Sequence, residues 1–335
     1  MSSAPTADEI VRDATWLAQA LDPATGAVRL IAMNREGYRA ASFLDDRLLA
    51  SPVDAHVVAW TEIEAAMAGQ PRSDARWIFH IGHVGSTLVS RLLGEIAGVL
   101  AIREPRLLRD LALGPPEARA RYLPLTPQLM SRTFGAGEIA CVKATSFVSE
   151  IAAQLVPPGE RALFLYARPR NYIASILAGE NSVQELRMLA ASRAQRMAPR
   201  VAALATRNDA ELAAAAWACE MTALEDAAEA MTGRQLFWAD FDAMLGDMPA
   251  ELARVAEGFG FSADRAQLRA IAGGPLMGRY SKAPEYEYSP ALRGELIGDA
   301  AAAHAREIDD ALALVARAAE KSPLLARALE RAGEA

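Results

Sequence analysis

Short apolar runs alternate with helix-like segments through the middle of the chain. The runs are almost free of charge and cover residues 77–81, 99–102, 139–142, 162–166 and 235–238. Continuous apolar runs of this length are typical of strands that are buried on both faces of a parallel sheet. We therefore predict an α/β fold in three layers, in which a central parallel sheet is flanked by helices and joined by right-handed crossovers.

Residues 1–71 have a different pattern and are predicted to form a helical N-terminal extension. A capping box begins a helix over 6–21, and a Ser-Pro pair begins another over 51–67. Residues 28–33 read as a short strand between them. We see no catalytic constellation in this extension, so we expect it to pack on the main domain.

Residues 72–335 are assigned to the main α/β domain. It contains an Ala-rich helical insert at about 180–232, which we expect to shape the acceptor side of a site. A long loop covers 273–290 and carries three tyrosines and two basic residues. Loops of this length in a compact domain are usually functional or disordered, and this composition favours function. Ser289 and Pro290 then begin a helical C-terminus.

A glycine turn follows the first apolar run of the domain. Gly82 and Gly85 allow the backbone to bend sharply there, and Ser86 and Thr87 stand where a helix begins. A helix that opens from such a turn directs unpaired N–H groups and the positive end of its dipole at one spot. The turn is therefore predicted to bind an anion, typically a phosphate.

Polar and mostly basic residues follow the other predicted strands. Arg103 and Glu104 end the run at 99–102, Lys143 ends the next, and Arg168 follows the third. Ligands of open parallel sheets bind beyond the carboxyl ends of the strands. We therefore expect these side chains to converge with the glycine turn on one crevice.

Composition and charge narrow the classes of function. The chain has 335 residues, is 52% hydrophobic and 23% charged, and has a formal net charge of −7. Such an acidic chain is not expected to bind nucleic acid through bulk electrostatics. Its N-terminus has no basic region followed by an apolar core, and no charge-free run is long enough to span a membrane. We therefore expect a cytoplasmic protein with no membrane partner.

Cysteine and histidine show no metal-binding spacing. Cys141 and Cys219 lie far apart, and Cys141 falls within an apolar run, so we expect a core residue rather than a disulfide. The four histidines are His56, His80, His83 and His304. No metal is predicted.

The turn differs from the phosphate loop of nucleoside triphosphatases, G-x-x-x-x-G-K-[ST]. When the two are aligned on Gly85, His80 replaces the first glycine and Ser86 replaces the lysine, while Thr87 keeps the hydroxyl. Without the lysine there is no point charge for the β- and γ-phosphates. Ordinary ATP or GTP hydrolysis is therefore disfavoured.

Two segments resemble motifs of the sulfotransferase family. Residues 85–87 are similar to its [KR]-x-G-[ST]-[ST] turn, which holds the 5′-phosphosulfate of the donor, and the following helix matches as well. Arg168 and Ser175 resemble its later R-x-P-x(5)-S-like element, which binds the 3′-phosphate. The resemblance covers about 76–260, and the loop to 290 loosely. It is closer to the bacterial and protein-tyrosine branch than to the cytosolic branch. It implies a P-loop-type fold.

Two positions depart from these motifs. His83 stands where the family has the lysine or arginine that steadies the bridging oxygen of the departing phosphate, and a histidine does this only when protonated. Ala167 stands where the family has its arginine, which places Arg168 one position late. The alternative for His83 is a turn residue bonded to backbone.

The resemblance implies a sulfotransferase that uses 3′-phosphoadenosine-5′-phosphosulfate as donor cosubstrate, without a metal. It implies Glu104 as the base for a hydroxyl acceptor, with Lys143 and His83 as the other catalytic residues. The acceptor is expected to be a small molecule or a peptide, and homodimer formation stays open. The donor is expected to contact Gly82, His83, Val84, Gly85, Ser86, Thr87, Leu88, Arg168, Ser175, Ser281 and Lys282.

Each of these assignments has an alternative. Glu104 could belong to a surface ion pair with Arg103 or Arg106, and Lys143 could face water at its strand end. At the level of the whole protein, the alternatives are a nucleotide-binding or kinase-like P-loop protein, with Asp240 as a magnesium ligand, and a non-catalytic binding protein that keeps the fold.

Overall fold

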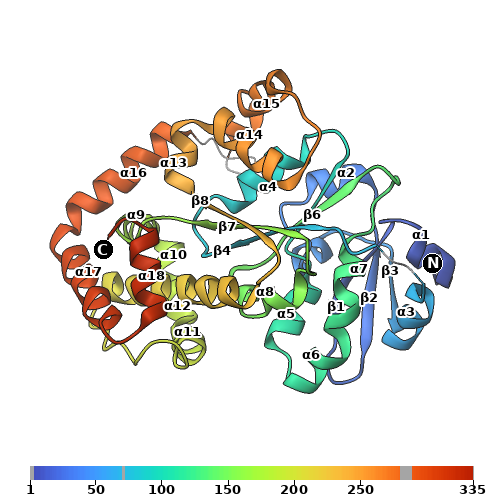
Figure 1. Ribbon diagram of the computed structural model, residues 1–335, viewed down its shortest axis with the longest axis horizontal. Helices are drawn as coiled ribbons and strands as arrows, with labels where there is room; N and C mark the ends of the chain where they lie inside the picture. The colour runs from blue at the N-terminus through green and yellow to red at the C-terminus, as the bar shows by residue number, and fades with distance from the viewer. Residues whose placement is uncertain (1–3, 70–71, 280–288, 335) are drawn as a thin grey trace.

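The chain folds around a five-stranded parallel sheet in the computed structural model, which describes residues 4–69, 72–279 and 289–334 (Figure 1). The strand order is β5-β6-β4-β7-β8, and every neighbouring pair is parallel. The predicted apolar runs correspond to β4 (Arg76–His80), β5 (Val99–Arg103), β6 (Ile139–Lys143), β7 (Arg161–Tyr166) and β8 (Gln235–Asp240).

The centre of the sheet is buried on both faces, which explains why its strands have unbroken apolar sequences. Trp77, Ile78 and Phe79 of β4 are all fully buried. Phe79 packs edge-on against Phe164 of β7, with ring centroids 5.8 Å apart. The α/β class and the parallel sheet predicted from the sequence are therefore confirmed.

Helices cover both faces of the sheet, so the molecule has three layers (Figure 1). One layer contains α4 (Ser86–Gly94), α13 (Phe241–Gly246), α14 (Met248–Phe259) and α15 (Arg265–Ala272), followed by η4 (Pro275–Gly278). The other contains α5 (Arg106–Leu113), η3 (Ser146–Ile151), α8 (Ala152–Leu155) and α12 (Asp209–Ala230). Between β5 and β6 the chain also forms α6 (Pro116–Tyr122), η2 (Leu123–Leu125) and α7 (Thr126–Met130).

A group of helices surrounds α12 at one end of the sheet. Trp217 in the middle of α12 is fully buried, and its indole Nε1 donates to the carbonyl oxygen of Ala167 at 2.9 Å. This group contains α9 (Pro169–Leu177), α10 (Glu180–Met188), α11 (Ala190–Met197), α16 (Pro290–Ala303), α17 (Ala305–Ala319) and α18 (Pro323–Arg331). The predicted helical C-terminus is confirmed.

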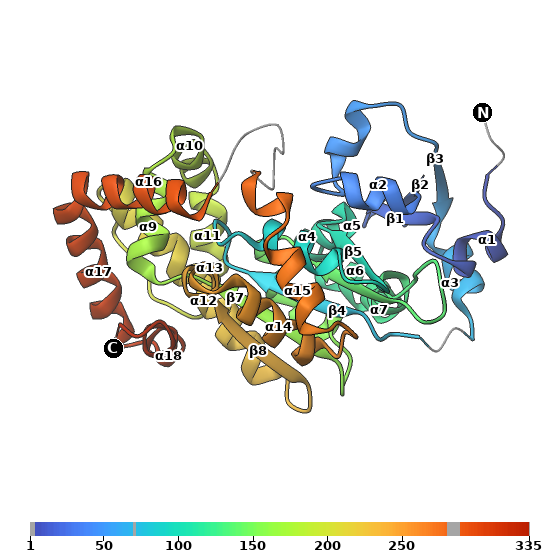
Figure 2. The same ribbon diagram turned by 90° about the horizontal axis from the view of Figure 1, so that it is seen from above.

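The N-terminal segment differs from its prediction, because it contains an antiparallel sheet as well as helices. The order is β1-β2-β3, and Figures 1 and 2 place this sheet and the C-terminal helices at opposite ends of the molecule. The elements are α1 (Ala7–Arg12), β1 (Trp16–Leu21), β2 (Ala27–Ala32), α2 (Arg35–Ala40), η1 (Asp46–Ala50), β3 (Ala55–Ala59) and α3 (Trp60–Met67). The strand predicted at 28–33 is confirmed by β2.

The predicted helix over 6–21 is present only in its first part, and the predicted helix over 51–67 only in its last part. The capping box is present, but the first helix ends at Arg12, because Asp13 turns the chain by accepting the amide hydrogen of Thr15 at 2.8 Å. Every residue of β1 is buried, between β2 and α5. Residues 55–59 likewise pair with β2 instead of beginning a helix. Pairing partners distant in sequence decide both cases. The boundary at residue 71 stays a prediction.

Two further findings concern the chain as a whole. Cys141 and Cys219 are both free and buried, so the expected core cysteine is confirmed. Among residues 4–69, 72–279 and 289–334, no helix combines the length and the low polarity that a membrane crossing requires.

Candidate functional site

A cavity of about 490 Å³ opens at the carboxyl edge of the parallel sheet. Its floor is the segment between β4 and α4, together with the ends of β5 and β6. The start of α10, the start of α13 and the face of α16 close its sides. The expected crevice beyond the strand ends is therefore present.

The glycine turn has the strained backbone of a tight strand-to-helix connection. Gly82, His83 and Gly85 all have positive φ, at 80°, 52° and 56°. A Cβ atom at Gly85 would overlap the ring of Phe241, so a glycine is required there for both conformation and space. His83 has a left-handed conformation that is uncommon for a residue with a side chain.

The first turn of α4 lines the cavity and has backbone amides without an acceptor in the helix. The first bond of the helix runs from the amide of Val89 to the carbonyl of Gly85 at 3.1 Å, so the amides of Ser86, Thr87 and Leu88 have no acceptor within the helix. The hydroxyl of Thr87 is buried and has no hydrogen-bond partner among the described residues. A buried hydroxyl beside open amides fits a phosphate or sulfate oxygen.

Glu104 and Lys143 form a buried ion pair at the ends of β5 and β6. The Lys143 ammonium donates to Glu104 Oε1, and their side chains are only 1% and 10% exposed. The hydroxyl of Thr145 donates to Glu104 Oε2 at 3.2 Å. The alternatives in which Lys143 faces water and Glu104 pairs with a neighbouring arginine are therefore wrong. Arg106 pairs with Asp46 and Asp110 instead.

Glu104 is also held in a strained backbone conformation, with φ at 52°. Its amide donates to the carbonyl of Lys143 at 2.7 Å. Below it, His80 accepts the amide hydrogen of Gly82 through Nδ1 at 3.0 Å and points Nε2 toward Glu104 Oε1, 3.9 Å away. Strain of this kind costs about 1–3 kcal/mol and often marks functional positions.

The N-terminal segment contributes to the cavity, which the sequence did not predict. Phe43 and Arg47 line it, and the ammonium of Lys143 lies 5.5 Å from the ring centroid of Phe43. Arg47 stacks on the same ring at 3.3 Å and donates to Asp45 Oδ2 at 2.6 Å. Burial alone would raise the pKa of Asp45, but its bonds from Arg47 hold that pKa below the usual value.

Two residues expected at the crevice lie elsewhere. Arg103 is buried, and its guanidinium donates to the carbonyls of Tyr38, Arg39 and Ala41, which fastens the N-terminal segment to β5. Burial lowers the pKa of Arg103 to about 10. Arg103 is not among the residues that line the cavity, whereas the next residue, Glu104, follows β5 in a left-handed conformation and lines it.

Arg168 is the second residue outside the cavity. Its side chain is 59% exposed and pairs with Asp240 Oδ2 at 3.2 Å. Asp240 also caps α13 by accepting the amide hydrogen of Asp242 at 3.0 Å. Ser175 does line the cavity, although its hydroxyl donates to the carbonyl of Tyr172 at 2.8 Å.

The other predicted donor contacts divide into two groups. Every residue from Gly82 to Leu88 lines the cavity. Ser281 and Lys282 lie outside the described residues.

Arg193 and Arg293, which the sequence did not single out, also line the cavity, and so does Arg279, one of the two basic residues of the predicted loop at 273–290. Arg293 of α16 pairs with Asp242 Oδ1 at 3.1 Å and lies 5.3 Å from the ring centroid of Phe241. Arg193 and Arg293 lie on helices with generic sequence patterns, and only tertiary packing brings these two side chains to the site. No group of metal-ligating side chains occurs in the part of the chain that the structure describes.

Comparisons with known proteins return similarity in structure only. No protein-family model matches the chain, and no curated protein matches it. A sulfotransferase domain from the curacin biosynthetic pathway aligns at 13% identity with a TM-score of 0.42, over 68% of this chain and 89% of that one. A sulfotransferase domain from the Synechococcus PCC 7002 olefin synthase aligns at 15% identity and 0.41, over 67% and 86%.

Mouse sulfotransferase SULT7A1, solved in complex with PAP, aligns at 10% identity with a TM-score of 0.41, over 77% of this chain and 89% of that one. Similarity at this level leaves activity, donor and acceptor open. These have to be argued from the residues of the cavity.

Proposed function

We propose that this protein transfers a sulfuryl group from 3′-phosphoadenosine-5′-phosphosulfate to a hydroxyl acceptor. The observation that carries the proposal is that the first turn of α4 and the Glu104–Lys143 pair line the same cavity. The first is suited to a phosphate, and the second provides a carboxylate and a cation beside it. Sulfuryl transfer needs these groups and no metal.

The donor would lie with its phosphosulfate on the glycine turn. The amides of residues 86–88 have no acceptor within α4, and the buried hydroxyl of Thr87 has no hydrogen-bond partner among the described residues, so these groups can donate to its oxygens. Ser175 and Arg293 line the same cavity and are the residues that we assign to the 3′-phosphate. The contact expected from Arg168 is left out, because that side chain pairs with Asp240 outside the cavity.

Glu104 would act as the base for the acceptor. Its carboxylate takes the hydroxyl proton while the acceptor oxygen bonds to sulfur and the bond from sulfur to the bridging phosphate oxygen breaks. Lys143 stays positive and stabilises the charge on the sulfuryl oxygens. His83 would stabilise the phosphate as it leaves, which requires its protonated form.

Thermal-shift measurements test the donor class. Adenosine 3′,5′-bisphosphate in the presence of EDTA is expected to raise the melting temperature of the protein, because it would bind the folded protein with its 5′-phosphate on the turn. Stabilisation by ATP that depends on magnesium would support the kinase-like reading instead. A response to neither nucleotide would support a binding protein that keeps the fold.

One observation weakens the kinase-like reading beyond the missing lysine. Asp240, its candidate magnesium ligand, already caps α13 and pairs with Arg168. Its two carboxylate oxygens are therefore engaged by the protein.

A further inference from the structure

Arg193 of α11 is a buried cation whose hydrogen bonds are incomplete. The residue is 8% exposed, and its Nε donates to Glu220 Oε1 over a long distance of 3.4 Å. Among the described residues, Glu220 is the one carboxylate that pairs with Arg193, and the buried Nη1 atom has no hydrogen-bond partner. A buried guanidinium nitrogen without an acceptor is costly, so this arrangement calls for one.

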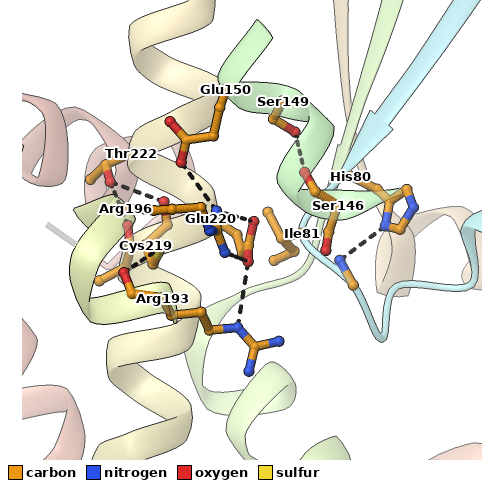
Figure 3. Close-up of polar contacts among 12 residues, drawn as sticks. His80, Ile81, Ser146, Ser149, Glu150, Arg193, Arg196, Cys219, Glu220 and Thr222 are labelled. Carbon is orange, nitrogen blue, oxygen red and sulfur yellow. Dashed lines mark hydrogen bonds and ion pairs between the residues drawn. The ribbon is translucent and has the colours of Figure 1, made fainter. Parts of the chain in front are cut away.

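Arg193 is the end of a ladder of alternating charges (Figure 3). Arg196 lies between Glu220 and Glu150, at 2.6 Å and 3.1 Å, and Arg200 pairs with Glu150 at 2.7 Å. Burial alone would lower the pKa of Arg196, but the two carboxylates raise it above the usual value. The ladder therefore contains two carboxylates and three guanidinium groups.

The two ends of this ladder differ. Arg200 has acceptors for all its nitrogens, since it also donates to Thr222 Oγ1 at 3.3 Å and to the carbonyl of Cys219 at 3.4 Å. Among the residues that the structure describes, the guanidinium of Arg193 bonds to Glu220 alone, and it points away from the rest of the ladder in Figure 3. Arg193 lines the cavity beside the glycine turn, and Arg200 does not.

We propose that Arg193 binds an oxyanion of the ligand in this cavity, with Glu220 and Arg196 holding it in place. The oxyanion is either a phosphate or sulfuryl group of the donor or a carboxylate of the acceptor. The inference deepens the proposed function and rests on it for the identity of these two ligands. A guanidinium that is held by a carboxylate on one side and open on the other suits such a group.

The ladder itself offers a matched control. Arg193→Met leaves Glu220 paired with Arg196, and Arg200→Met leaves Glu150 paired with Arg196. Each variant therefore removes one terminal arginine and leaves both carboxylates paired. Arg193→Lys keeps the charge with a different shape, so it should retain part of the binding if Arg193→Met loses it.

The experiment measures binding of three probes to the wild type and these variants by thermal shift and calorimetry. Adenosine 3′,5′-bisphosphate tests the donor. 4-Hydroxyphenylacetate tests a carboxylate of the acceptor. Its binding is compared with that of 4-ethylphenol, which lacks the carboxylate, and both are measured with the bisphosphate present. Sulfate without nucleotide tests the oxyanion site alone. We expect Arg193→Met to lower the binding affinity for at least one probe by about tenfold to a hundredfold. Arg200→Met should bind all of them like the wild type.

The probe whose affinity falls in Arg193→Met identifies the source of the oxyanion. Unchanged binding of all three probes to Arg193→Met would overturn the inference, as would an equal loss in Arg200→Met or a wild type that binds none of them. A wild type that binds sulfate but not the bisphosphate would contradict the proposed function. In that case the sulfate measurement still decides the role of Arg193.

Discussion

Glu104 and Lys143 meet as a buried ion pair because Glu104 directly follows β5 and Lys143 ends the adjacent parallel strand β6. Arg103 lies opposite Lys143 in the sheet, and the next residue, Glu104, turns back through a left-handed backbone conformation. The carboxylate is thereby placed against the ammonium at the floor of the cavity. A surface ion pair would not need this strain, which is typical of a functional site.

Glu104→Gln is expected to reduce sulfuryl transfer by about a hundredfold or more, since a positioned general base contributes roughly that much. The amide keeps the shape of the side chain but cannot take the proton. Binding of adenosine 3′,5′-bisphosphate should not change. Single-turnover assays with the labelled donor and a panel of phenols measure the first quantity, and calorimetry measures the second.

A matched control for this variant is Glu95→Gln, at the far end of α4 and exposed to solvent. It should transfer at the wild-type rate. Transfer by Glu104→Gln at an undiminished rate would remove Glu104 from the role of base.

Lys143→Met is expected to lower the free energy of unfolding by about 3 kcal/mol, because it leaves a buried carboxylate without its ammonium. The double variant with Glu104→Gln should recover a large part of that loss, since the unpaired charge is then gone. Urea denaturation of the wild type, both single variants and the double variant gives the coupling energy. Additive losses would show that the two side chains do not stabilise each other.

The sequence predicted the parts of the site that lie next to strands. β4 and β6 are buried on both faces, so their apolar runs and the polar residues that end them can be read directly. The turn at 82–88, Glu104 and Lys143 were found in this way. Arg103 was misplaced because its guanidinium binds backbone carbonyls of the N-terminal segment, which lies more than 60 residues away in the sequence.

The remaining parts depend on packing between distant segments. Arg193 and Arg293 lie on helices whose patterns fit any amphipathic helix, and nothing local tells which side chain will face the cavity. Phe43 and Arg47 come from a segment distant in sequence, which Arg103 fastens to β5 by donating to the carbonyls of Tyr38 and Ala41. In the N-terminal segment, pairing with β2 replaces the helix that the sequence predicted at 16–21 and at 55–59.

Gly85→Ala is expected to disrupt the glycine turn more strongly than Gly82→Ala. Both residues have positive φ, so both variants should lose about 1–2 kcal/mol of stability from backbone strain. At Gly85 the new methyl group also overlaps the Phe241 ring, whereas nothing lies within 4 Å of a Cβ at Gly82. Urea denaturation should therefore rank Gly85→Ala as the less stable, and Phe241→Ala should relieve part of the difference. Equal stabilities would contradict this account of the turn.

The two cysteines are expected not to react with thiol reagents in the folded protein. Burial raises the pKa of Cys141 to about 12 and that of Cys219 to about 12. At pH 8 neither thiol should react with dithionitrobenzoate, whereas both should react in guanidinium chloride. The unfolded chain releases these protons near pH 9, so the free energy of unfolding should fall as the pH rises from about 9 toward 12. Rapid labelling of the native protein would show that one thiol is accessible and that its pKa is not raised by burial.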